Sequence, residues 1–285
     1  MSLVMLCGLA GCGSSDSGER VLAVSIPPQK AILEPLTCGR FRVECMVGES
    51  TDAETAEPDM RSMARLEHAE AYLTLGGLPF EQAWIDRLKA AFPDLYIIDT
   101  TEGMSLLADH DCGHEHHSEE ETAEEFDPHV WTSLRNAKIM AANMRRELVR
   151  LDPSGKTLYD SACIEISRRL DAADDSIRMI LSTCRDHVFM TWHPSLGYFA
   201  RDYGLTQLSV QQEGKEVSPR RLAEAITECR RRKPVLMFCD EAASAAPENE
   251  MLRSDLGIPV YSLRLMSYDF VGQLIKAAKA IAENQ

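Results

Sequence analysis

The sequence lacks any long apolar run. None of its stretches approaches the roughly 18–20 consecutive apolar residues that a membrane-spanning helix needs. Basic residues are also scarce, because 30 Lys and Arg stand against 45 Asp and Glu, giving a formal net charge of -15. A surface this negative repels nucleic acid and anionic lipid and attracts cations. We therefore expect no nucleic-acid partner.

Several catalytic motifs are absent as well. The chain contains no HExxH pair, no G-x-S-x-G and no P-loop, so common metalloprotease, hydrolase and nucleotide-binding signatures are missing. None of the nine cysteines forms a CxxC pair. Cys38 with Cys45, and Cys229 with Cys239, are close enough in sequence for disulfides in an oxidising compartment. Buried free thiols fit the same spacing equally well, so the pairing stays open.

The N-terminus has the order of parts found in a bacterial lipoprotein. Residues 1–9 are apolar, residues 9–12 read Leu-Ala-Gly-Cys, and a Gly, Ser and Asp stretch follows. This pattern resembles a lipobox, in which Cys12 becomes the acylated first residue of the mature protein. The plainer alternative is a frayed terminus with a chance cysteine. We expect residues 1–20 to be a signal and tether, and the protein to be a periplasmic or cell-surface, membrane-anchored lipoprotein.

The rest of the chain alternates between strand-like and helical patterns. Such alternation predicts parallel βαβ units. Residues 153–182 form a long helical stretch, about 40 Å at 1.5 Å per residue, which is typical of a rigid spine between two lobes. We therefore predict an α/β fold with two doubly wound lobes, parallel sheets, one long spine helix and a ligand cleft between the lobes. The predicted parts are an N-terminal lobe over 21–152, the spine over 153–182 and a C-terminal lobe over 183–285.

One segment breaks this alternation. Residues 109–127 are rich in Asp, Glu and His and contain no Lys or Arg, which is typical of a solvated loop. Clustered imidazoles among carboxylates can gather Zn²⁺ weakly and pass it on. A soluble spacer without a specific role is the alternative. The candidate metal-collecting residues are His110, His114, His116 and His117.

Two other histidines lie in settings that favour a metal site. His129 follows Asp-Pro at the end of the acidic loop, and His193 lies where a predicted strand passes into a helix. The carboxyl ends of parallel strands are where open α/β sheets place their ligands. Each lobe supplies one imidazole, and two imidazoles suit Zn²⁺, which binds His nitrogen at about 2.0–2.1 Å. Two unrelated structural histidines would explain the spacing equally well.

A family resemblance favours the metal site. Residues 25–28 (Ser-Ile-Pro-Pro), 127–131 (Asp-Pro-His-Val-Trp) and 192–194 (Trp-His-Pro), followed by the run 198–205, resemble segments of the cluster 9 (ZnuA- and TroA-like) metal-binding solute-binding proteins. The similarity covers nearly the whole mature chain. It implies that His129 and His193 bind metal. It also implies that the loop collects Zn²⁺.

The sequence departs from the family pattern at two positions. Glu54 stands where members often have a further metal-binding histidine, and a carboxylate can also ligate Zn²⁺. Arg264 stands where the last lobe usually supplies an Asp. The nearest acid is Asp269, for which capping of the terminal helix is the alternative role. Glu213 and Glu216 are further carboxylates that could complete the site.

The resemblance implies a binding protein, not an enzyme. Its expected cargo is Zn²⁺, with Mn²⁺ or Fe²⁺ as alternatives, and its expected partner is the membrane permease of an ABC importer. We expect a monomer. Two other functions stay open: an adhesion or non-metal ligand-binding lipoprotein with a degenerate site, favoured by Glu54 and Arg264, and a zinc-dependent hydrolase using two His and a carboxylate.

Overall fold

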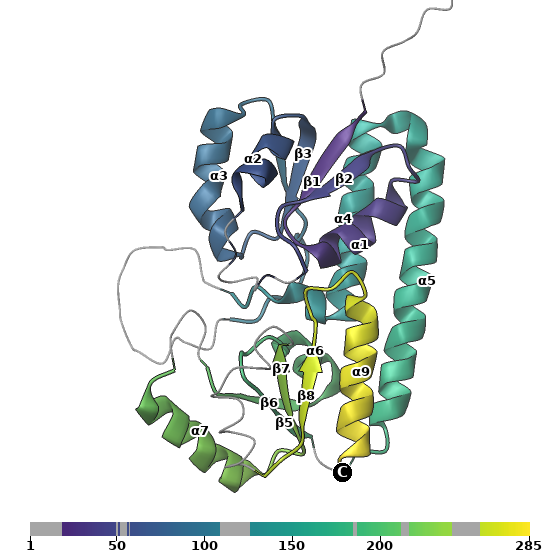
Figure 1. Cartoon of the computed structure of the whole chain (residues 1–285). Coiled ribbons are helices and arrows are strands. Elements are labelled where there is room, and N and C mark those ends of the chain that lie inside the picture. The colour runs from purple at the N-terminus through teal and green to yellow at the C-terminus, as the bar shows by residue number, and fades with distance from the viewer. Residues whose placement is uncertain are drawn as a thin grey trace, which may run out of the picture.

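A computed structural model describes residues 19–49, 51, 56, 58–108, 126–184, 187–211, 217–240 and 257–285. Within these ranges the chain forms two four-stranded parallel sheets with helices packed around them, arranged as two lobes beside one long helix (Figure 1). The fold class predicted from the alternating pattern is therefore confirmed. The sequence pattern also predicts a helix over residues 245–256, which lie outside the described residues.

The N-terminal sheet has the strand order β2-β1-β3-β4. Residue Val21 of β1 pairs with Arg42 of β2 on one side and with Ala69 of β3 on the other, so β1 is a central strand. All four positions of β1 are buried, as expected for a parallel strand covered on both faces. The elements of this lobe are β1 (Val21–Val24), α1 (Pro27–Leu36), β2 (Arg42–Cys45), α2 (Met60–Leu66), β3 (Ala69–Thr74), α3 (Pro79–Ala91) and β4 (Tyr96–Asp99).

The C-terminal sheet repeats this topology with the order β6-β5-β7-β8. Successive side chains of its strands face opposite sides. Phe189 and Phe238 join the main core, whereas Met190 and Met237 belong to a smaller core that includes side chains of α7. The elements are β5 (Val188–Thr191), α6 (Gly197–Tyr203), β6 (Thr206–Ser209), α7 (Pro219–Arg232), β7 (Met237–Asp240), β8 (Val260–Leu263) and α9 (Phe270–Glu283).

The long helix α5 (Lys156–Leu181) runs alongside both lobes (Figure 1). It packs against α4 (Leu134–Leu151) in the upper part of the molecule and against α9 in the lower part. A single cluster of buried apolar side chains extends from β1 through α5 to α9. The predicted spine is therefore present, but it begins later than residue 153, because residues Pro153–Gly155 form a separate 3₁₀ turn.

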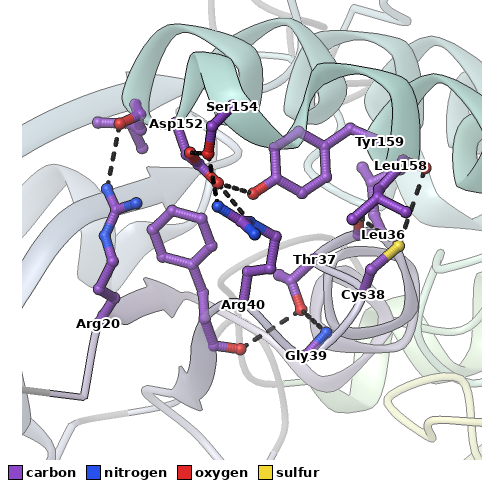
Figure 2. Close-up of polar contacts among 12 residues, drawn as sticks. Arg20, Leu36, Thr37, Cys38, Gly39, Arg40, Asp152, Ser154, Leu158 and Tyr159 are labelled. Atoms are coloured by element: carbon purple, nitrogen blue, oxygen red, sulfur yellow. Dashed lines mark hydrogen bonds and ion pairs between the residues drawn. The ribbon is translucent and has the colours of Figure 1, made fainter. Parts of the chain in front are cut away.

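A polar network joins the start of the spine to the N-terminal lobe (Figure 2). Arg40 Nε lies 2.5 Å from Asp152 Oδ2, and the hydroxyl of Tyr159 donates to the same oxygen at 2.6 Å. The hydrogen bond from Arg40 is the main reason that the pKa of Asp152 is held well below its usual range. Gly155 is required here because a Cβ at this position would lie 2.4 Å from the Tyr159 ring. The network fixes the angle at which α5 leaves the lobe.

Among the described residues, no helix is both long enough and apolar enough to cross a membrane. The six cysteines in the described ranges are free thiols, and they include both candidate disulfide pairs. The structure therefore favours the free-thiol alternative for Cys38, Cys45, Cys229 and Cys239.

Candidate metal centre

His129 is presented by a short, well-anchored turn between the two lobes. It precedes a 3₁₀ turn over Val130–Thr132, and its backbone N–H donates to Asp127 Oδ1 at 2.8 Å. Its ring Nδ1 lies 2.9 Å from the same carboxylate oxygen. A carboxylate only accepts hydrogen bonds, so this contact places the imidazole proton on Nδ1 and makes Nε2 the ring nitrogen that carries the lone pair. A buried histidine held this way is oriented as metal ligands usually are.

His193 comes from the other lobe, directly after β5. The sheet order is β6-β5-β7-β8, so the strand order reverses between β5 and β7. Open parallel sheets bind ligands at such a point. The carbonyl of His193 accepts a hydrogen bond from Ser195 N at 2.8 Å, which tightens the turn into α6. The His193 side chain is half-buried. The position predicted from the strand-to-helix transition is therefore the position found.

The two imidazoles meet at one point. Their Nε2 atoms are 3.2 Å apart, and the rings are edge to face with centroids 5.0 Å apart. Two nitrogens bound to one tetrahedral Zn²⁺ at the usual bond length would be separated by about 3.3 Å. The observed separation therefore matches the separation that a single shared ion requires.

A small cavity of about 60 Å³ opens beside the two rings. Its polar wall includes Asp240, the last residue of β7, together with the thiol residue Cys239. Asp240 was not recognised from the sequence, although an acid at the carboxyl end of a predicted parallel strand is the signal that could have found it. The apolar part of the wall comes from Trp131, Leu196, Phe238, Leu263, Leu265 and Met266.

The other predicted carboxylate of this lobe lies elsewhere. Asp269 caps α9, where its side chain accepts a hydrogen bond from Gly272 N at 3.2 Å, and the residues lining the cavity do not include it. The exposed Arg264 follows β8 directly, and its backbone N–H donates to Gln273 Oε1 at 3.1 Å. The capping alternative for Asp269 is thus the contact that the structure shows, and a role as a metal ligand stays a prediction.

The part of the chain described here supplies two clear nitrogen ligands. Within it, no group of three or more His, Cys, Asp and Glu side chains is gathered closely enough to hold an ion. The remaining predicted site residues lie outside the described ranges, so the structure does not test them. They are Cys12, Glu54, His110, His114, His116, His117, Glu213 and Glu216.

Two parallel α/β lobes on one long helix, with one histidine from each lobe at the junction, are the features of a two-lobed cation-binding protein. Comparison with known proteins agrees. The chain belongs to the ZnuA family, described as zinc-uptake complex component A, periplasmic, whose family model matches residues 22–283. This is a family of binding proteins rather than enzymes, which removes the hydrolase alternative.

Three individual proteins illustrate the similarity. The chain is 27% identical over 280 residues to the zinc-binding lipoprotein AdcA of Streptococcus pneumoniae TIGR4, covering 92% of this chain and 55% of that protein. It is 24% identical over 264 residues to the high-affinity zinc uptake system protein ZnuA of Bacillus subtilis, covering 90% and 82%. A crystal structure of a ZnuA superposes with a TM-score of 0.81 at 30% identity, covering 93% and 99%. The chain thus spans about half the length of the streptococcal relative.

Proposed function

We propose that this protein captures Zn²⁺ between its lobes and delivers it to the membrane permease of an ABC importer. The observation that supports this most strongly is the 3.2 Å separation of the Nε2 atoms of His129 and His193. Family membership and the zinc-binding relatives named above support the same cargo. Two imidazoles favour Zn²⁺ over Mn²⁺, which prefers carboxylate and water oxygens. Fe²⁺ is a weaker alternative, because it lies below Zn²⁺ in general affinity for such sites.

The proposed ligand set has a nitrogen half and an oxygen half. His129 and His193 supply the nitrogens, and Glu54 from the N-terminal lobe is the proposed third ligand. For the C-terminal lobe we favour Asp240 over Asp269, because Asp240 lines the cavity while Asp269 caps a helix. A set of two imidazoles and two carboxylates would complete the four ligands that Zn²⁺ usually takes.

In this scheme the protein binds the ion and catalyses no reaction. The ion exchanges bound water for protein ligands, and the apolar wall around Trp131 and Phe238 limits the return of water. Protons compete for the same imidazole nitrogens, so we expect affinity to fall as the pH is lowered. Because α5 packs against both lobes, we expect release to involve loop movement more than a change of lobe angle.

The decisive experiment is a competition titration of the metal-free protein against a chromophoric zinc chelator. We expect His129→Ala and His193→Ala each to weaken Zn²⁺ binding by orders of magnitude, because a site with few strong ligands depends on each of them. His68→Ala is the matched control, since His68 is an exposed histidine in the same protein and should leave affinity unchanged. Wild-type affinity in both cleft variants would reject the metal site and favour the non-metal lipoprotein alternative.

Two further proposals concern residues outside the described ranges. We propose that Cys12 carries the lipid anchor, and retention of a Cys12→Ala variant in the membrane fraction would contradict this.

We also propose that the loop histidines gather Zn²⁺ for the cleft. Deleting residues 110–125 should then lower the number of weakly bound ions and leave one tight site, which equilibrium dialysis can count. We expect the protein to work as a monomer.

A further inference from the structure

The ring of Phe126 packs directly on the bare backbone of Gly77. A Cβ added at Gly77 would lie 2.7 Å from both Cε2 and Cζ of Phe126. Carbon atoms in contact prefer separations of about 3.5–4.0 Å, so no larger residue fits without moving the ring. Gly77 is not among the positive-φ glycines of the described chain, unlike its neighbour Gly76. Glycine is needed at position 77 for space and not for backbone conformation.

A buried carboxyl group holds the turn that carries Gly77 through hydrogen bonds. Glu81, in the first turn of α3, accepts a hydrogen bond from Leu75 N at 2.9 Å and another from the Ser25 hydroxyl. The backbone N–H groups of Gly76 and Leu78 also stabilise its charged form. Ser25 Oγ in turn lies 2.8 Å from the hydroxyl of Tyr72. The turn between β3 and α3 is therefore held in one position.

Phe126 is also linked directly to the metal-binding turn. It forms an isolated antiparallel bridge with Ala108, and the next residue, Asp127, donates from its backbone N–H to Leu107 O at 3.0 Å. Asp127 is the residue whose carboxylate holds both the backbone and the ring of His129. A displacement of Phe126 that reaches its backbone would therefore also move the residue that orients the imidazole.

We propose that the Gly77 turn is a positioning element for His129, and that the contact between Gly77 and Phe126 sets how tightly the cleft holds Zn²⁺. This inference rests on the proposed function. Neither residue lines the cavity, so the effect acts through Asp127. The turn after β3 thereby supports a ligand that enters the site from a different part of the chain.

The test measures Zn²⁺ affinity and Zn²⁺ release rate in the full chain, at a temperature well below melting. Gly77→Ala should push the Phe126 ring away, weaken binding about tenfold and speed release, an effect typical of lost outer-shell support. Phe126→Leu should restore most of the affinity in the Gly77→Ala background, because the ring atoms that collide are absent. In the wild-type background Phe126→Leu should instead weaken binding. This reversal of sign is a coupling that loss of stability alone would not produce.

The matched control is Gly48→Ala, because a Cβ at Gly48 meets nothing within 4 Å. Its affinity should equal that of the wild type. Unchanged affinity in Gly77→Ala, or a loss that Phe126→Leu does not restore, would overturn the inference. If Gly77→Ala does not fold, Phe126→Leu alone decides, and wild-type affinity there would overturn it. Loss of binding in His129→Ala with none in Gly77→Ala would reject this inference and leave the proposed function standing.

Discussion

The two lobes have the same strand order, but the crevice where that order reverses is closed by side chains in one lobe and open in the other. In the N-terminal lobe, the ends of β1 and β3 are closed by the buried network of Ser25, Tyr72 and Glu81. In the C-terminal lobe, the ends of β5 and β7 border an open cavity that contains His193 and Asp240. Both crevices arise from the same topology. The side chains, not the fold, decide which crevice binds a ligand.

The closed crevice contains a carboxyl group that is costly to ionise. Burial is the main cause that raises the pKa of Glu81 to about 7. One of its oxygens, Oε2, has no hydrogen-bond partner among the described residues. An unfolded Glu titrates near 4.5, so the folded state binds this proton more tightly than the unfolded state does. The stabilisation from this group is complete below about pH 4.5 and is lost as the pH rises through 7.

Glu81→Gln should therefore have the largest effect in this comparison. It keeps the acceptor oxygen for Leu75 N but removes the charge, so the variant should gain stability relative to the wild type as the pH rises. The expected gain between pH 5 and pH 8 is on the order of 3 kcal/mol in the free energy of unfolding. Urea unfolding of both metal-free proteins at the two pH values measures it. If the difference in unfolding free energy between the two proteins did not change with pH, folding would not raise the pKa of Glu81.

Removing the carboxylate that orients His129 should have the next largest effect. Asp127→Ala leaves the imidazole without its Nδ1 partner, and we expect Zn²⁺ affinity to fall by about 10–100-fold. Asp127→Asn retains an acceptor oxygen without the charge and should lie between the alanine variant and the wild type. Chelator competition measures all three. Equal affinity in wild type and Asp127→Ala would mean that the open crevice holds its ligands without this support.

The smallest effect is expected at the open edge of the C-terminal crevice. Asp240→Asn should weaken Zn²⁺ binding by less than about tenfold, because Asp240 is an exposed member of the proposed ligand set and its charge is screened by solvent. The loss should shrink further at high salt. Asp86→Asn, an exposed carboxylate on α3, is the control and should change nothing. An Asp240→Asn effect as large as that of His193→Ala would contradict this ranking and show that Asp240 contributes as much to binding as an imidazole.

The alternation of strands and helices and the long spine helix could be predicted from the sequence because their signals are local. β1 is a short buried apolar run, and Asp59 and Ser133 cap α2 and α4 through their side chains as such residues do at helix starts. His129 and His193 stand at recognisable chain positions, after Asp-Pro and after a strand, but these positions alone left two structural histidines equally open, and the family resemblance favoured a metal site. Their common location followed from the two-lobed topology.

What the sequence could not show depends on distant contacts. Glu81 looks like an ordinary acid in the first turn of a helix, where a negative side chain interacts favourably with the helix dipole. Only the packing of Ser25 and Leu75 around it reveals a buried carboxyl group. Asp240 looks like a strand-end acid until β5 and β8 place it at the cavity. In the same way, Gly77 acquires its role only because Phe126 packs on it.

The uninterrupted core along α5 has a thermodynamic consequence. Apolar side chains of both lobes belong to one cluster, so the lobes should melt together in one cooperative transition. A ligand that binds only the folded cleft then stabilises the entire molecule. At free Zn²⁺ a thousandfold above its dissociation constant, this linkage amounts to about 4 kcal/mol. The melting temperature of the whole chain would thus report the occupancy of a site formed by a few side chains.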